Sequence, residues 1–539
     1  MFLSLTPRLR FGIRCSNNLL SKRSASNYSR NKLLRGPTAQ DVSYFRSVLA
    51  RPDYSVLDGT ANQDVKDEID NRYNIDWTKH YQGSSDLVLR PQTTLEVSSI
   101  LKYCNENYIG VTTQGGNTGL CGGATPISKE VILSMECMNR IYKLDEYSGV
   151  LTCDAGCILQ SLHDHAEQNG YLFPLDIGSK GTCQIGGNVS TNAGGHHFFR
   201  FGGLHGTVVG MEVVLADGRV LRMNIDANDH DYNNEKTYQS QQSSSSVRKD
   251  NTGYDLKQLF IGGEGTLGVV TKVAVACPAL PTSKNVALLV CNCYKDVLQV
   301  LKTSKEQLGE ILSAIELIDL NTMKFVQRYG SGIGDHLISE LLASEVADNQ
   351  PLFILVESQG CDQEADSSKM DAFLTSLYES STIDNGFLAQ DSKHMEEIWG
   401  IRESCNPSVA RAGYVHKFDV SIGIESYIDV ANEVIATLKR TNLPDLTVCV
   451  WGHVADGNAH INVVSGQLEN NAAEAEIIEN IVYAAVIKRK GSISAEHGIG
   501  QSKRKYMSQV KDGTALELMS QMKTLFDPHF ILNPGKYLP

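Results

Sequence analysis

Two periodicities alternate along this chain, one typical of strands and one typical of helices. A helix is predicted to begin at Thr94, because Thr93 and Glu96 have the spacing of a capping box and apolar residues follow at helical intervals. Runs of strand length occur at residues 109–113, 131–133 and 151–153, and residues 213–221 predict a hairpin with an Asp217-Gly218 turn. The alternation predicts a fold that mixes helices and sheet.

The second half of the chain continues this alternation after a boundary that the prolines at residues 277–281 mark. Strands are predicted at 285–291, 314–318 and 351–357, with helices near 296–308 and 368–377. We therefore predict an α+β protein in which a second α+β domain lies over the first. Residues 224–248 are rich in asparagine, aspartate, glutamine and serine, which predicts a solvated, disordered insertion.

Three glycine-rich segments adjoin predicted strands, at residues 114–123, 178–195 and 260–268. Glycine has no Cβ, so such a loop can bring its backbone N–H groups close to an oxyanion. A single loop of this kind is more often a surface turn. Three of them predict that the chain wraps one long, phosphate-bearing ligand. The third also matches G-x-G-x-x-G, but β-branched residues follow it instead of a helix, which disfavours a nicotinamide-binding Rossmann unit.

The first 40 residues differ from the rest of the chain in charge. They contain eight lysines and arginines and no acidic residue, with serines and leucines between them, which is typical of a mitochondrial transit peptide. A basic tail that binds nucleic acid is the alternative. Removal of those eight charges changes the net charge from −13 to −21, so we do not expect the remaining chain to bind nucleic acid.

Cysteine usage and hydropathy restrict the compartment. The chain has 13 cysteines with no C-x-x-C pair, which favours reduced thiols over a disulfide framework. No run of eighteen apolar residues occurs, so we expect no transmembrane segment.

Two histidines flank an Asp-Gly pair near the C-terminus. If Asp456-Gly457 forms a two-residue hairpin turn, His453 and His460 lie directly opposite each other and can share one metal ion. Asn462 points to the same face as His460, and Glu496 supplies a third ligand. Two histidines and one carboxylate leave open positions on zinc, as catalytic sites do. Exposed or hydrogen-bonded histidines without an ion are the alternative interpretation.

The three glycine loops, in this order and spacing, resemble the FAD-binding domain of the vanillyl-alcohol-oxidase-type flavoproteins. The resemblance extends to residues 174–178, 251–256 and 532–536 and covers nearly everything after residue 50. It implies an FAD-binding domain at 41–280, a substrate-binding cap domain at 281–450 and a C-terminal region at 451–539 with metal ligands and flavin contacts. The implied FAD contacts are Gly115, Gly116, Asn117, Thr118, Gly119, Gly122, Pro174, Asp176, Gly178, Gly181, Gly186, Gly187, Asn188, Thr191, Asn192, Gly195, Gly265, Val270 and Asn533.

Within these flavoproteins the C-terminal motifs are most similar to the D-2-hydroxyglutarate dehydrogenases. That resemblance implies a metal held by His453, His460 and Glu496, with zinc favoured over manganese or cobalt. It also implies that His497 is the proton acceptor. The implied substrate contacts are His497, Asn462, and the carboxylate-binding residues Arg402 and Lys417. The family usually has threonine four residues after the arginine, where this chain has Asn406, which can still donate a hydrogen bond.

The expected chemistry explains these residue types. A 2-hydroxy acid can chelate a divalent ion, which lowers the pKa of the hydroxyl, and a histidine near neutral pKa can take the proton. Hydride would then pass from C2 to flavin N5 while Arg402 and Lys417 hold the distal carboxylate. Residues 114–123 contain no histidine, the usual attachment point in related enzymes, so we expect non-covalent FAD.

Three other functions remain open from the sequence. The nearest is a D-lactate or other D-2-hydroxy-acid dehydrogenase on the same scaffold. The histidines and Glu496 alone would also suit a zinc hydrolase, and the glycine loops alone would suit a flavoprotein that only carries electrons. The resemblance further implies electron-transfer flavoprotein as the electron acceptor and the mitochondrial matrix as the location.

Overall fold

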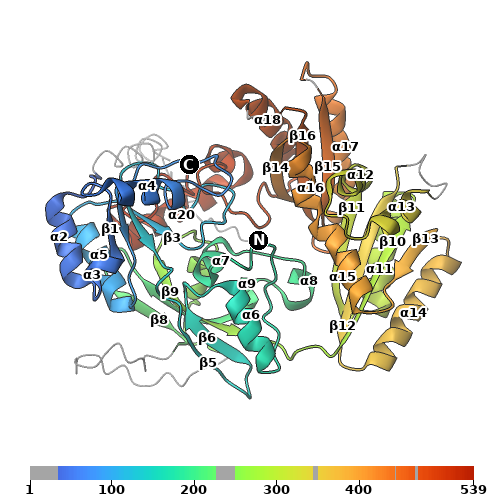
Figure 1. Ribbon diagram of the computed structural model, residues 1–539, viewed down its shortest axis with the longest axis horizontal. Coiled ribbons are helices and arrows are strands. Elements are labelled where there is room, and N and C mark those ends of the chain that lie inside the picture. The colour runs from blue at the N-terminus through green and yellow to red at the C-terminus, as the bar shows by residue number, and fades with distance from the viewer. Residues whose placement is uncertain (1–33, 226–248, 344–349, 444, 468–470) are drawn as a thin grey trace, which may run out of the picture.

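A computed structural model describes residues 34–225, 249–343, 350–443, 445–467 and 471–539. The first domain contains two sheets (Figure 1). The first has the order β1-β2-β4-β3, in which β2, β4 and β3 are parallel and β1 is an antiparallel edge. Its strands are β1 (Val56–Asp58), β2 (Leu87–Leu89), β3 (Val111–Gln114) and β4 (Val131–Ser134). The five strands of the second sheet are antiparallel in the order β5-β6-β9-β7-β8.

The strands of this second sheet are β5 (Ile141–Leu144), β6 (Val150–Asp154), β7 (Val208–Val214), β8 (Val220–Met223) and β9 (Val269–Ala276). The helices of the first domain pack around both sheets. They are α2 (Ala39–Val48), α3 (Pro52–Ser55), α4 (Gln63–Arg72), α5 (Thr94–Glu106), α6 (Leu159–Gln168), α7 (Ile185–Thr191), α8 (Phe198–Phe201), α9 (Leu204–Thr207) and α10 (Lys257–Phe260).

The predicted capping box is confirmed in α5. The Thr93 side chain accepts from the N–H of Glu96, and the Glu96 carboxylate accepts from the N–H of Thr93. The apolar residues at helical spacing after it are all fully buried in the core of the first domain. The capping box therefore fixes where the helix begins, and the apolar stripe fixes which face packs inward.

The second domain is built on one antiparallel seven-stranded sheet, in the order β13-β10-β12-β11-β15-β16-β14. Its strands are β10 (Ser283–Cys291), β11 (Leu312–Asp319), β12 (Leu352–Gly360), β13 (Asn385–Leu388), β14 (Tyr414–Ser421), β15 (Leu446–His453) and β16 (Asn458–Ser465). Its helices are α11 (Tyr294–Gln307), α12 (Leu320–Tyr329), α13 (Asp335–Ala343), α14 (Gln363–Glu379), α15 (Ser392–Glu403), α16 (Cys405–Ala412), α17 (Tyr427–Leu438) and α18 (Ala472–Lys488). Two apolar clusters cover parts of its two faces.

The C-terminal region predicted at 451–539 is divided between the two domains. Residues up to Ile493, and also Tyr506, pack in the core of the second domain, whereas Ile531 and Leu532 are fully buried in the core of the first. Leu532 forms a parallel bridge with Val111 of β3, and α20 (Gly513–Phe526) packs beside the first domain (Figure 1). The segment between them, which carries Glu496 and His497, crosses from one domain to the other.

The two domains contact each other directly through the segment before and within α8. His197 lies 3.1 Å from the buried carboxylate of Glu357 on β12. Arg200 donates to the carbonyl oxygens of Ile311 and Gln359, both at 2.6 Å. These contacts fix one face of the seven-stranded sheet against the first domain.

Two predicted segments fall partly outside the described residues. These outside parts are residues 1–33 of the predicted transit peptide and residues 226–248 of the predicted insertion. Residues 34–40 are part of the fold, because Arg35 pairs with the buried Asp41 at 2.6 Å and α2 begins at Ala39. The predicted leader boundary at residue 40 therefore includes Arg35, which pairs with the folded domain.

Candidate active site

The hairpin that carries the two predicted histidine ligands differs from its predicted register. Trp451, not His453, lies opposite His460. The predicted two-residue turn at Asp456-Gly457 is therefore wrong, and four residues connect the two strands. The displacement is two residues, and side chains along a strand alternate with a period of two. His453 and His460 therefore still share a face, with their ring centroids 5.5 Å apart.

His453, His460 and Glu496 bring three potential ligand atoms within 4.8 Å of one another. Burial raises the pKa of Glu496 to about 7, although His453 opposes this shift, so the carboxylate lacks the counter-charge that its position requires. Burial also lowers the pKa of His460 to about 3. A neutral imidazole and a desolvated carboxylate are the donors that a divalent cation prefers, so these residues fit a metal.

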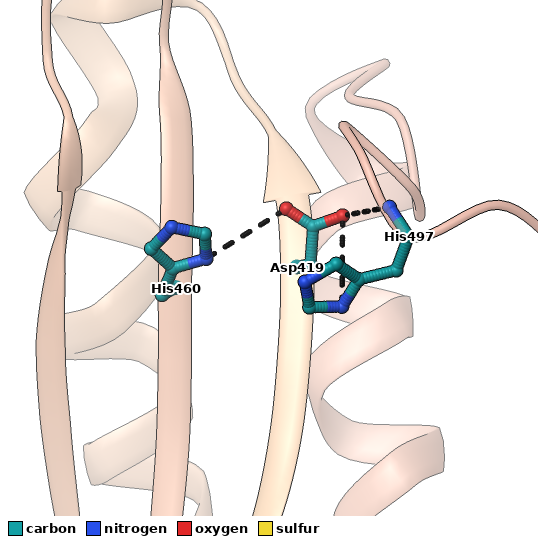
Figure 2. Close-up of side chains that lie close together, drawn as sticks. All are labelled: Asp419, His460 and His497. Carbon is teal, nitrogen blue, oxygen red and sulfur yellow. Dashed lines mark hydrogen bonds and ion pairs between the residues drawn. The ribbon is translucent and has the colours of Figure 1, made fainter. Parts of the chain in front are cut away.

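Asp419, His460 and His497 form a second group of the same size (Figure 2). Its carboxylate is already used, because Oδ2 accepts three backbone N–H groups and Oδ1 accepts from Asn458 Nδ2 at 3.0 Å. A carboxylate with its lone pairs so occupied is a poor ligand. The group with Glu496 therefore fits an ion better.

Each histidine of the candidate metal site has a carboxylate beside its Nδ1 atom. His453 Nδ1 lies 2.5 Å from Glu316 Oε1, and His460 Nδ1 lies 3.7 Å from Asp419 Oδ1. Burial alone would lower the pKa of His453, but the charge and hydrogen bond of Glu316 raise it to about 9. His453 Nε2 then lies 3.6 Å from Glu496 Oε1, an arrangement like that of carboxylate–histidine–metal sites.

The predicted carboxylate-binding residues lie around this centre. Arg402, at the end of α15, donates from Nε to Glu316 Oε2 at 2.8 Å. Lys417 on β14 forms no ion pair among the described residues, and its Nζ lies 5.2 Å from the centre of the Trp77 ring. Burial lowers the pKa of Lys417, so an anion beside it would satisfy an unpaired cation.

Asn462 and Asn406 differ in their surroundings. Asn462 is buried on β16 opposite Lys417, and its amide donates to the His460 carbonyl at 3.2 Å. Asn406 is exposed at the start of α16 and forms no hydrogen bond within the described part of the chain. The structure thus brings Asn462 to the site and leaves Asn406 without a described contact there.

The glycine loops line two adjoining cavities of about 140 and 450 Å³. The cavities share Gly115, Gly116, Asn117 and Gln184, so they form one elongated space along the first loop. His497 lines the smaller cavity. The predicted base therefore faces the space that the three glycine loops enclose. The other predicted cofactor residues that line the two cavities are Thr118, Gly119, Gly181, Gly186, Gly187, Asn188, Thr191, Gly265, Val270 and Asn533.

Two observations show that this space fits a large polar ligand. Thr113 Oγ1, Gln184 Oε1 and Asn188 Oδ1 are buried beside it without a hydrogen-bond partner in the described structure. A Cβ at Gly116 would lie 2.1 Å from the Thr182 carbonyl oxygen, so only glycine lets the two segments approach. Unpaired buried polar atoms are costly unless a ligand satisfies them, and FAD offers the matching groups.

The remaining predicted cofactor residues lie outside these two cavities. Pro174, Asp176 and Gly195 line a separate, smaller cavity. Asp176 pairs with Lys180 at 3.0 Å, and Gly122 packs against the Tyr81 ring. Gly178 and Asn192 line none of the three cavities described here.

Sequence reasoning missed three carboxylates of the site, the buried Glu316 and Asp419 and the half-buried Glu264. Glu316 lies within the mostly apolar β11, Asp419 lies within β14 two residues after Lys417, and Glu264 lies within the third glycine loop. A single acidic residue inside a buried strand must be paired, so this pattern was the available signal. The partners could not be read from the sequence, because they lie between 39 and 236 residues away.

Comparisons with known proteins identify the fold and the cofactor class. Residues 85–224 match the FAD binding domain model, and residues 280–537 match the model of the C-terminal domain of FAD linked oxidases. Two solved structures share the fold: alkyldihydroxyacetonephosphate synthase has a TM-score of 0.68 at 14% identity, over 93% of this chain and 86% of that one. For p-cresol methylhydroxylase the TM-score is 0.67 at 17% identity, over 92% and 96%. The chain is an FAD-dependent oxidoreductase with the vanillyl-alcohol-oxidase-type fold, as predicted.

Sequence relatives define the family more narrowly. A probable mitochondrial D-2-hydroxyglutarate dehydrogenase of Oryza sativa subsp. japonica is 41% identical over 96% of this chain and 85% of its own length. The mitochondrial D-2-hydroxyglutarate dehydrogenase of Danio rerio is 40% identical over 93% and 86%. A putative mitochondrial D-lactate dehydrogenase of Schizosaccharomyces pombe is 39% identical over 93% and 90%. The chain belongs to the D-2-hydroxyglutarate dehydrogenase family.

Proposed function

We propose that this protein oxidises D-2-hydroxyglutarate to 2-oxoglutarate, with His497 as the general base. The observation that carries the proposal is that His497 lines the cavity of the glycine loops and directly follows Glu496 of the candidate metal site. The residue that lines the cofactor cavity thus directly follows a candidate metal ligand in the sequence. The names of the relatives supply the substrate.

Each of the proposed substrate contacts matches one group of a 2-hydroxy dicarboxylate. Arg402 and Lys417 are the cations for the distal carboxylate, and Asn462 is a neutral donor next to them. Burial lowers the pKa of His497, so its imidazole is neutral at pH 7 and can accept the proton of the 2-hydroxyl. When bound, FAD would accept the hydride from C2, and a divalent ion held by His453, His460 and Glu496 would acidify the hydroxyl.

Other parts of the proposal rest on the family alone. We propose zinc as the ion, non-covalent attachment of the FAD, electron-transfer flavoprotein as the acceptor and the mitochondrial matrix as the location. The relatives are named as mitochondrial proteins. In the part of the chain that the structure describes, no helix has the length and apolar character needed to cross a membrane.

Anaerobic bleaching of the flavin tests the function. Purified protein should be yellow, and D-2-hydroxyglutarate should bleach it faster than L-2-hydroxyglutarate or D-lactate. Chelation should slow the bleaching while the FAD stays bound, and zinc should restore it. Bleaching by no hydroxy acid would contradict the proposal, and a colourless protein with hydrolytic activity would favour a zinc hydrolase.

A D-lactate dehydrogenase is the second candidate, because one relative carries that name and Asn406 replaces the usual threonine. A 2-hydroxy monocarboxylate such as D-lactate has no distal carboxylate for Arg402 and Lys417 to bind. Equal bleaching rates with D-lactate and D-2-hydroxyglutarate, each at saturation, would favour this candidate.

A further inference from the structure

The crossing segment that carries Glu496 and His497 is held by its backbone from one side. Asp419 Oδ2 accepts from the N–H groups of Ala495, Glu496 and His497 at 3.1, 2.7 and 2.9 Å. Figure 2 shows this carboxylate between the backbone of His497 and the rings of His460 and His497. Asp419 is almost completely buried at 1% exposure on β14, so these bonds form away from water, where charge-assisted hydrogen bonds are strongest.

A second carboxylate, on a half-buried glutamate, holds the rest of the same segment from the other domain. Glu264, in the third glycine loop, accepts from the N–H of Ile499 at 2.6 Å and of Gly500 at 2.8 Å. Its side chain lines the cofactor cavity. A Cβ at Gly498 would lie 2.6 Å from Glu264 Oε1, and the φ of Gly498 is +78°, so glycine is required where the loop passes the carboxylate.

A buried cation follows the held segment. Lys503 is 4% exposed, and its ammonium has no hydrogen-bond partner among the described residues. Its backbone N–H donates to the carbonyl oxygen of Ile499 at 3.1 Å, so Lys503 is tied to the part of the segment that Glu264 holds. The positive charge of Lys503 opposes the rise in pKa that burial causes at Asp419 and, together with Lys536, at Glu264.

We propose that Asp419 and Glu264 are positioning residues that jointly hold residues 495–500, so that His497 faces the cofactor and Glu496 faces the metal ion. Five backbone N–H groups of this segment bond to the pair, and each domain supplies one carboxylate. The catalytic segment therefore has its working shape only when both domains are docked. The inference rests on the proposed function for the roles of Glu496 and His497.

Asp419 also acts on the histidine rings directly. Its oxygens lie 3.7 Å from His460 Nδ1 and 3.9 Å from His497 Nδ1, which is ion-pair distance and too long for a hydrogen bond. The negative charge favours a proton on both Nδ1 atoms and so leaves the Nε2 lone pairs free. Glu264 forms no ion pair with a histidine among the described residues. Its loss is therefore expected to affect the held segment without affecting the histidine rings.

Two isosteric variants and one control test the proposal in the full-length holoprotein. Asp419→Asn and Glu264→Gln remove the charge but keep the shape. Asp319→Asn is the control, because Asp319 also accepts a backbone N–H, from Thr322, and belongs to the same domain as Asp419 without contacting the segment. For each variant, the zinc and FAD contents, the melting temperature, and the rate and substrate dependence of flavin bleaching by D-2-hydroxyglutarate are measured.

We expect Asp419→Asn to lower the limiting bleaching rate about 10- to 100-fold and to weaken zinc binding by a similar factor. Glu264→Gln should lower the limiting rate while zinc binding stays close to that of the wild type. Neither variant should change the substrate concentration for half-maximal rate by more than about threefold, because neither carboxylate contacts the distal carboxylate site. Asp319→Asn should lower only the melting temperature.

Unchanged bleaching rates and zinc contents in both variants would overturn the proposal, as would losses that merely follow the melting temperature. If the variants do not fold, hydrogen exchange on the wild-type holoprotein decides the question. The amides of residues 495–497, 499 and 500 should exchange at rates typical of buried strands, and exchange typical of open loops would refute the proposed clamp. If D-2-hydroxyglutarate fails to bleach the wild type, the proposed function fails, while zinc affinity and hydrogen exchange still test the clamp.

Discussion

The Nε atom of Arg402 donates a hydrogen bond to the buried carboxylate of Glu316 at 2.8 Å. The other oxygen of Glu316 lies against His453. One carboxylate thus contacts both the arginine that we propose for the substrate and a histidine that we propose for the metal. Because Nε is occupied, only the terminal nitrogens of the guanidinium would be free to bind a substrate carboxylate.

Replacement of Glu316 by glutamine should impair metal binding and substrate binding together. Removing one member of a buried ion pair leaves the other charge unpaired and costs about 3–5 kcal/mol. We expect lower zinc content and at least a tenfold higher KM for D-2-hydroxyglutarate. Glu357→Gln is the matched control: it is an equally buried strand carboxylate, but it pairs with His197 and Lys284 at the domain interface. It should lower the melting temperature with zinc content and KM unchanged, and the same result for Glu316→Gln would contradict its dual role.

Lys417→Met should discriminate between dicarboxylate and monocarboxylate substrates. A charge-assisted hydrogen bond contributes about 1.5–3 kcal/mol, which corresponds to roughly 10- to 100-fold in kcat/KM. The loss should appear with D-2-hydroxyglutarate and be smaller than threefold with D-lactate. Lys417 makes no ion pair among the described residues, so its removal strands no buried carboxylate. Equal losses with both substrates would show that Lys417 does not bind the distal carboxylate.

His497→Gln should slow flavin bleaching by about 10²- to 10⁴-fold, the usual contribution of a general base. Burial lowers the pKa of His497 below its ordinary value of 6.5, so the neutral base persists at and below neutral pH. The bleaching rate of the wild type should therefore fall only as the pH drops below about 6.5. In the variant this acid limb should be absent. An acid limb of the same midpoint in both proteins would assign the titration to another group.

Gly116→Ala should prevent FAD binding, because the new methyl group would overlap the Thr182 carbonyl oxygen and separate the first two glycine loops. Gly206→Ala is the control, since nothing lies within 4 Å of its Cβ position and Gly206 lines none of the cavities described here. The ratio of absorbance at 450 nm to 280 nm measures the FAD content. A fully yellow Gly116→Ala protein would show that the two loops can separate without losing the cofactor.

The regular elements could be predicted because their causes are local. The capping box at Thr93, and the strands and helices after Pro281, follow from residues adjacent in the sequence. The histidine pair was predicted with the wrong register, yet on one face, because an even displacement preserves the side of a strand. By contrast, Glu316 meets His453 only because β11 pairs with β15 in the sheet, which no local pattern encodes.

The burial of Ile531 and Leu532 in the core of the FAD domain has a consequence for synthesis. That core needs residues from both ends of the described chain, whereas the seven-stranded sheet and its helices come from one continuous stretch. During translation the second domain is complete before residues 531 and 532 are made. It can therefore fold while the core of the first domain still lacks these two residues. We therefore expect FAD to be captured only after residues 531 and 532 have left the ribosome.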